Sequence, residues 1–135
     1  RTSEKNGMRA WAWADHGWYN PSFYDMCPKS VVLSNWFYDI KYAGFDIKTN
    51  NTEDKMRLQC FYELDKRGFD QIPCGSTCEC DENFGELVPW CRQRISKDRL
   101  KGFLMAPWSS GWPARGCTTI EQSYLKSIDL VRAAM

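Results

Sequence analysis

Four short apolar segments constrain the fold of this chain more than any other feature of its sequence. They lie at residues 8–14, 31–37, 69–74 and 102–108, and their starts are about 25 to 40 residues apart. A tight hairpin needs only a few residues between its strands, whereas a parallel crossover needs a dozen or more, usually as a helix. The spacing therefore predicts repeated strand-plus-helix units with parallel strands.

The segment at residues 52–67 has the clearest helical pattern. Asn51 or Thr52 can cap its start, acidic residues follow in the first turn, and Gly68 is placed to end it. Three of its residues recur every four positions and are expected to face inward: Met56, Cys60 and Leu64.

Helices are also expected after the third and fourth strands. Residues 84–95 keep a helical period, but Pro89 would cost about 3 kcal/mol inside a helix, so we expect a break or kink near Val88. Residues 118–134 begin with two capping-box pairs, at Thr118 and Thr119. Their apolar face, expected to pack on a sheet, consists of Ile120, Tyr124, Ile128 and Val131. The first connection has room for only a turn or two, at residues 22–26.

Together these elements predict an α/β fold, a partial (β/α) barrel of about four parallel strands with three to four helices. Residues 1–135 would form a single domain or a domain fragment, with βα units starting near residues 8, 31, 69 and 102. Because a complete eight-stranded barrel needs about 250 residues, the chain is expected to form a half barrel. The two unpaired edges of such a sheet predict self-association or completion by a complementary barrel segment.

Charge and hydropathy exclude two classes of partner. Eighteen basic and seventeen acidic residues give a net charge of +1, without the one-sided field that attracts nucleic acid. No apolar run approaches the roughly 20 residues of a membrane-spanning helix, so no membrane partner is predicted.

The seven cysteines leave three interpretations open. Because their number is odd, at least one thiol is unpaired or pairs outside the chain. Cys74, Cys78 and Cys80 crowd together, which is compatible with disulfides, with a zinc site or with buried free thiols. Their spacing does not match the usual zinc motifs, and the only histidine, His16, is distant, so no metal is predicted. The cysteines and a glycosylation sequon at Asn50 indicate a secreted or extracytoplasmic setting.

Tryptophans stand where three of the strands are expected to end, and at the first two of these ends a carboxylate lies beside the aromatic residues. In a parallel β/α array, ligands bind beyond the carboxyl ends of the strands. Indole rings suit the apolar face of a pyranose, and carboxylates suit its hydroxyls. We therefore predict a carbohydrate ligand, although the tryptophans would also serve to plug the barrel mouth. The predicted binding residues are Trp13, Asp15, Trp36, Tyr38, Asp39 and Trp108.

The segments that carry these strand ends resemble the later strands of β-N-acetylhexosaminidase-like glycoside hydrolase barrels. The resemblance touches residues 8–15, 27–39, 68–76 and 102–108, and its longest run is CPKSVVLSNWFYD. It implies that tryptophans wall the substrate pocket, that a Tyr-Asp pair holds the sugar, and that a final tryptophan lies near the closing strand. By position, the same six residues would inherit these roles.

The resemblance also implies a substrate-assisted hydrolysis in which the acetamido group of the sugar is the nucleophile. The catalytic Asp-Glu pair of that family lies on an earlier strand, and no such pair stands at a strand end here. We therefore expect the carbohydrate-binding half of a glycoside hydrolase-like barrel, with the catalytic acid outside this chain and no cofactor. The alternatives are a non-catalytic carbohydrate-binding protein and a cysteine-stapled secreted interaction protein.

Overall fold

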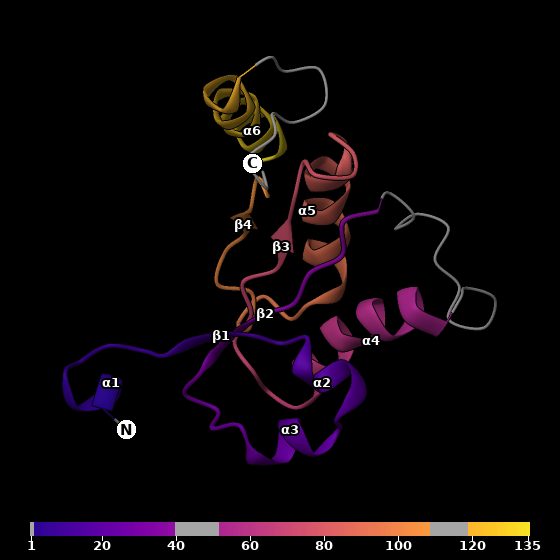
Figure 1. Cartoon of the computed structure of the whole chain (residues 1–135). Helices are drawn as coiled ribbons and strands as arrows, with labels where there is room; N and C mark the ends of the chain where they lie inside the picture. Colours follow the sequence, from indigo (N-terminus) through magenta and orange to yellow (C-terminus); the bar gives the residue numbers. More distant parts are fainter. Residues whose placement is uncertain (1, 40–51, 109–118) are drawn as a thin grey trace.

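A computed structural model of the protein describes residues 2–39, 52–108 and 119–135. Its first half contains α1 (Thr2–Lys5), β1 (Trp11–Trp13), α2 (His16–Tyr19), α3 (Ser22–Met26) and β2 (Val32–Ser34). The second half contains α4 (Thr52–Lys66), β3 (Cys74–Gly75), α5 (Asn83–Arg94), β4 (Leu104–Met105) and α6 (Ile120–Ala134). In Figure 1, α5 runs beside β3, and α6 lies beyond β4 at the opposite end of the molecule from α3.

The strands form two separate two-stranded sheets. β1 pairs with β2 in parallel, with Trp13 opposite Ser34, and β3 pairs with β4 in parallel, with Cys74 opposite Leu104. Between the two pairs, the described residues form only isolated parallel bridges, such as that of Trp36 with Cys74. The prediction of a partial (β/α) barrel with about four parallel strands is therefore wrong. The described part of the chain has six helices and no four-stranded sheet.

Proline explains part of this difference. The third strand was expected at residues 69–74, but Pro73 has no N–H to donate to a ladder, and β3 begins only after it. The carbonyl of Pro73 still accepts a hydrogen bond from the Leu104 N–H, at 2.9 Å. Only two residues on each strand then form a ladder. The parallel direction of both pairs nevertheless agrees with the spacing of the apolar segments.

Helix α4 lies where the sequence predicts it and carries much of the core. Gly68 follows it with a left-handed φ of 76°, which glycine adopts without the cost that a Cβ would add. The buried side of the helix is formed by Leu58, Cys60, Phe61 and Leu64.

Helix α5 continues through Pro89, so of the break or kink expected near Val88 the break is wrong. Pro89 and Gly85, whose carbonyl loses its helical partner to the proline, both lie on the exposed side. Because water can reach that side, the missing hydrogen bond is tolerated there. The other side of α5 is buried against α4 and includes Phe84, Leu87 and Cys91.

Two apolar clusters hold the elements together. One lies between α4 and α5 and includes Phe37, Phe61 and Leu87. The other joins α3, β2 and α4 through Tyr24, Leu33 and further buried residues. No helix within the described ranges is long and apolar enough to cross a membrane.

Candidate binding site

Parallel pairing brings the carboxyl ends of β1 and β2 side by side. Trp13 is the last residue of β1 and is paired with Ser34, the last residue of β2. The Ala14 N–H donates to the Ser34 carbonyl at 2.9 Å, which holds the exit of β1 against β2. Trp36, two residues further along, bridges to Cys74 of β3. The chain segments that follow β1 and β2 therefore lie together at one edge, beside the start of β3.

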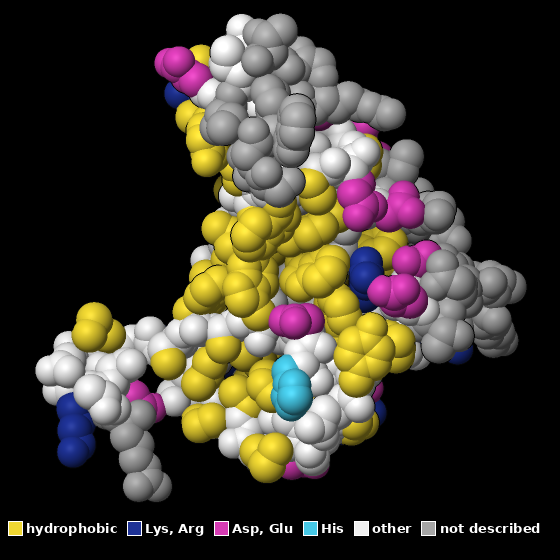
Figure 2. Space-filling model, in the orientation of Figure 1, with side chains coloured by type: hydrophobic (Ala, Val, Ile, Leu, Met, Phe, Trp, Pro, Cys, Tyr) yellow, Lys and Arg dark blue, Asp and Glu magenta, His cyan; other side chains and the backbone are white. Residues whose placement is uncertain are grey.

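A pocket of about 210 Å³ lies at this edge. Figure 2 shows the surrounding face, where hydrophobic side chains gather over the strands. The pocket contains four aromatic side chains and one carboxylate, and it is lined by Trp13, Asp15, Trp36, Tyr38 and Trp108. Five of the six residues predicted from the sequence are thus brought together.

The aromatic rings of the pocket form two contacting groups. Trp36 stacks on Tyr38 with ring centroids 4.7 Å apart and planes 21° from parallel. Trp13 and Trp108 contact each other at 5.9 Å with tilted planes. A hydrogen bond of 2.6 Å from the indole N–H of Trp108 to the hydroxyl of Tyr38 joins the two groups. The walls of the pocket therefore support one another in the absence of a ligand.

Tyr38 is the best-anchored polar group of the pocket. Its hydroxyl accepts from Trp108 and lies 3.9 Å from the Sγ atom of Cys74. Burial raises the pKa of Tyr38 well above its ordinary value, although the Trp108 hydrogen bond lowers it in part. Burial likewise raises the pKa of Cys74 to about 11. Both groups are therefore protonated at neutral pH, and among the described residues Asp15 is the one acidic side chain that lines the pocket.

Asp15 is placed differently from the aromatic residues. It is exposed and precedes α2, but its side chain makes no capping hydrogen bond to that helix. Within the described ranges its carboxylate also forms no ion pair. Both oxygens can therefore accept hydrogen bonds from a ligand.

Asp39, the sixth predicted binding residue, does not line the pocket, and neither does His16, the neighbour of Asp15. The backbone carbonyl of Asp39 accepts a hydrogen bond of 2.8 Å from the side chain of Asn83 in α5. His16 lies in α2, beside Asn20 and against the ring of Phe23. The structure therefore places His16 as a polar residue of a short helix and leaves Asp39 outside the pocket.

A second layer that the sequence analysis missed lies behind Trp36. The guanidinium of Arg57 sits 4.7 Å from the centroid of the Trp36 ring and 5.1 Å from that of Trp18. Asn35 accepts from the Trp18 indole at 2.8 Å and donates to the Arg57 carbonyl at 2.7 Å. Arg57 also forms an ion pair with Glu53. In the helical pattern of α4, Arg57 falls outside the stripe that was expected to face inward. That pattern therefore did not indicate that Arg57 would face a tryptophan.

Asn83 holds the strand ends from the other side. Its side-chain amide donates to the carbonyls of Phe37 and Asp39, both at 2.8 Å, and its oxygen accepts from the Ser76 N–H at 3.0 Å. The residue before α5 is Glu82, and its side chain makes no cap for the helix. Asn83 instead connects the segment that carries Tyr38 to the end of β3.

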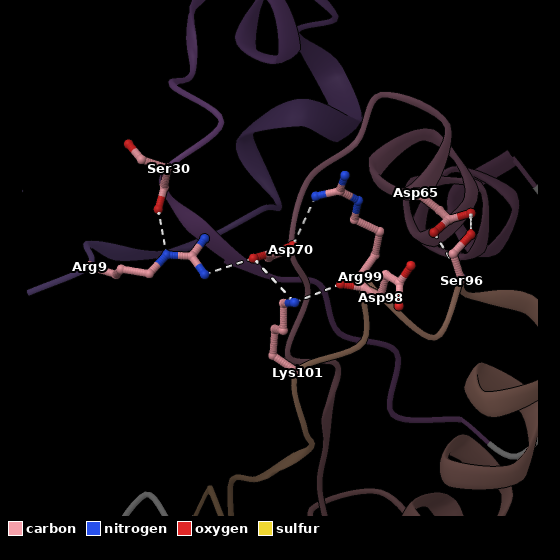
Figure 3. A network of polar contacts seen from close by, with 8 residues as sticks. All are labelled: Arg9, Ser30, Asp65, Asp70, Ser96, Asp98, Arg99 and Lys101. Carbon is pink, nitrogen blue, oxygen red and sulfur yellow. Dashed lines mark hydrogen bonds and ion pairs between the residues drawn. The ribbon is translucent and has the colours of Figure 1, made fainter.

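The opposite, amino end of the strands carries a cluster of ion pairs (Figure 3). The carboxylate of Asp70 lies 2.7 Å from Arg9, 3.2 Å from Arg99 and 3.7 Å from Lys101. Burial opposes the ionisation of Asp70, but the two arginine hydrogen bonds and the nearby positive charges outweigh it and hold its pKa below the ordinary value. The cluster connects residues that precede β1, β3 and β4.

The cysteines are free thiols where the structure describes them. Cys60, Cys74 and Cys91 are buried, and Cys27, Cys78 and Cys80 are at least partly accessible. Cys117 and the sequon at Asn50 lie outside the described residues. Within the described ranges, no group of three or more His, Cys, Asp or Glu side chains is arranged to hold a metal ion.

Comparison with protein-family models, with curated protein sequences and with solved structures found no match to this chain. Its function has therefore to be argued from the pocket itself.

Proposed function

We propose that this chain binds carbohydrate, without turnover, in the pocket formed by the ends of β1, β2 and β4. The observation that carries the proposal is the convergence of four aromatic rings and one exposed carboxylate from three separate parts of the chain. Aromatic faces contact the C–H surface of a sugar ring, and a carboxylate accepts hydrogen bonds from its hydroxyls.

The size of the pocket limits the ligand. Its volume of about 210 Å³ is below the roughly 300 to 1,000 Å³ of sites for drug-sized molecules. A single sugar ring, such as the end of a glycan, suits this space better than an internal segment. An N-acetylhexosamine is the favoured ligand, because the sequence resembles proteins that act on such sugars and the methyl of its acetamido group suits an aromatic wall.

The acidic groups favour binding over hydrolysis. Most glycoside hydrolases use a pair of carboxyl groups on either side of the scissile bond. Asp15 is the one carboxylate that lines this pocket among the described residues. The substrate-assisted reaction of the family that the sequence resembles uses an Asp-Glu pair, whereas the described lining residues supply one carboxyl group, that of Asp15, and the strongly held phenol of Tyr38.

The first test is a titration followed by tryptophan fluorescence, because three of the lining residues are tryptophans. N-acetylglucosamine should change the emission in a saturable way, and glucose should bind more weakly. Trp36→Ala should lower the affinity about tenfold or more, since it removes a ring that forms the wall. Tyr19→Ala is the matched control, because Tyr19 is an exposed aromatic residue that does not line the pocket.

A second test separates binding from hydrolysis. Asp15→Asn keeps a hydrogen-bonding group of the same shape, so affinity should change by less than about threefold. A chromogenic N-acetylhexosaminide should be hydrolysed no faster by the wild-type chain than by Asp15→Asn. Turnover that falls by orders of magnitude in Asp15→Asn would show a hydrolase instead. An absence of saturable binding for every sugar tested would refute the proposal.

A further inference from the structure

Helix α6 is oriented with its large apolar residues outward. The side chains that it turns toward the rest of the chain include Ser123 and Ser127, which are 1% and 4% exposed. Tyr124, Leu125 and Ile128 are 51%, 56% and 45% exposed. The sequence predicts the reverse, with Tyr124 and Ile128 on a face that packs against a sheet. An amphipathic helix normally buries its apolar stripe, so this orientation leaves an apolar face for another partner.

Polar contacts hold α6 in this orientation. Lys126 forms an ion pair of 2.5 Å with Asp81, next to the start of α5. The hydroxyl of Ser127 lies 3.5 Å from that of Thr77 and donates to the Ser123 carbonyl at 2.9 Å. The buried serines are thus hydrogen-bonded, and the orientation does not leave them without partners.

The exposed face has the spacing of a helix–helix seam. Five residues follow one another at intervals of four, three, four and three, which keeps them on one side of a helix at about 100° per residue. All five are exposed, and we call them the outer stripe: Glu121, Leu125, Ile128, Arg132 and Met135. The middle of the outer stripe is apolar, whereas a negative charge lies near its beginning and a positive charge near its end.

A groove beside the outer stripe adds further apolar surface. It has a volume of about 520 Å³ and lies between β4 and α6. Its apolar lining comes from Met105, Pro107, Tyr124, Ile128 and Val131. Ile128 and Arg132 belong to both the groove and the outer stripe, so a partner seated on the stripe would also cover part of the groove.

We propose that the outer stripe binds the outer stripe of a second copy of this chain, with the two α6 helices antiparallel. In that arrangement Leu125 lies against Ile128 of the second copy, and Glu121 lies against Arg132 at both ends. A parallel arrangement would place like charges together at each end. The stripe is therefore complementary to itself when the two helices are antiparallel and not when they are parallel. A two-fold symmetric interface requires such a self-complementary surface. This interaction is independent of the proposed sugar binding.

The expected dimer is weak and depends on concentration. A helix of 15 residues is about 22 Å long, so a single helix pair buries an area at the low end of specific interfaces. Sedimentation equilibrium over a wide range of protein concentration is therefore the appropriate measurement. The wild-type chain should shift from monomer to dimer within that range.

Charge reversal tests both the surface and its direction. E121R and R132E should each weaken the dimer about tenfold, because each places like charges together at both ends. A mixture of E121R chains with R132E chains should form a heterodimer more readily than either variant forms a homodimer, because every end pair is then opposite in sign. The double variant E121R/R132E should regain the wild-type dimer constant. These substitutions are on the exposed face, and each variant should keep the circular dichroism spectrum of the wild-type chain.

Two further variants complete the test. Leu125→Glu should weaken the dimer about a hundredfold, since it would place a charge in the apolar middle of the seam. Glu86→Arg is the matched control, because Glu86 is an exposed acidic residue of α5 outside the outer stripe. A wild-type chain that stays monomeric at every concentration would overturn the proposal. A dimer that is unaffected by E121R and by Leu125→Glu would overturn it equally, because another surface would then form the contact.

Discussion

The two ends of the strands each hold an aspartate, and the two aspartates have opposite surroundings. Asp70, at the amino ends, is nearly buried and pairs with three cations. Asp15, at the carboxyl ends, is exposed among aromatic rings and forms no ion pair with the described residues. The charge of Asp70 is thus neutralised within the protein, whereas that of Asp15 is open to a ligand. One end of the strands carries a network of ion pairs, and the other is where we propose that the sugar binds.

The largest expected effect concerns the amino end. Asp70→Asn removes the charge that holds Arg9, Arg99 and Lys101 together and leaves three cations in proximity. Because the cations are partly exposed, we expect a loss of about 1 to 3 kcal/mol in the free energy of unfolding. Asp15→Asn should change it by less than about 0.5 kcal/mol. Urea denaturation of both variants measures the difference, and equal losses would contradict the division between the two ends.

The pH dependence of stability should follow the same division. The pKa of Asp70 is lower in the folded protein than its ordinary value of 3.8, so its contribution is fully present above that value. The contribution is lost as the pH falls from there through the lower folded pKa. The difference in unfolding free energy between wild type and Asp70→Asn should therefore shrink as the pH is lowered from about 4 to about 2. A difference that stays constant over this range would show that Asp70 acts without its charge.

A smaller effect is expected at the carboxyl end and should appear in binding. Asp15→Ala removes the acceptor for sugar hydroxyls, which should weaken binding by about 1 kcal/mol, or about fivefold. Its free energy of unfolding should stay close to that of the wild type. Calorimetric titration with the sugar that binds best, together with urea denaturation, measures both quantities. A variant that loses stability without losing affinity would contradict the comparison.

The smallest effect is expected from the second layer. Arg57→Met keeps an apolar stem but removes the charge over Trp36, which should weaken sugar binding by about 0.5 to 1 kcal/mol. Arg94→Met is the matched control, because Arg94 lies at the same distance of 4.7 Å from the ring of Trp90, outside the pocket. An equal loss of affinity in the two variants would show that Arg57 does not act through Trp36.

Helices α4 and α5 differ in how well the local sequence predicts them, because it was sufficient for α4 but not for α5. The N-terminal acidic residues and Gly68 of α4 act within the helix itself, so its position follows from neighbouring residues alone. The break expected near Val88, because of Pro89, does not occur. The cost of a proline in a helix depends on whether water can hydrogen-bond to the carbonyl that has lost its helical partner. That exposure depends on which side of α5 packs against α4.

The pocket shows the same limit at a larger scale. The sequence predicts five of the pocket residues from their places at the ends of apolar segments, since parallel strands bring their carboxyl ends together. These residues are Trp13, Asp15, Trp36, Tyr38 and Trp108. Asp39 follows Tyr38 directly but does not line the pocket, and its backbone is held by Asn83 of α5. Arg57 and Asn83 act through contacts with segments far away in the chain, which no local pattern reveals.

The amino-acid sequence by itself determined the parallel direction of the strands, the helices α4 and α6, and most of the pocket residues. These features depend on periodicity, capping and connection length, which act over a few residues. The tertiary structure decided that the strands form two short pairs, that α6 turns serines inward, and that Asp15 and Asp70 differ in their partners. Those outcomes depend on hydrogen bonds and ion pairs between distant segments, and the competition among such contacts is settled only when the whole chain has packed.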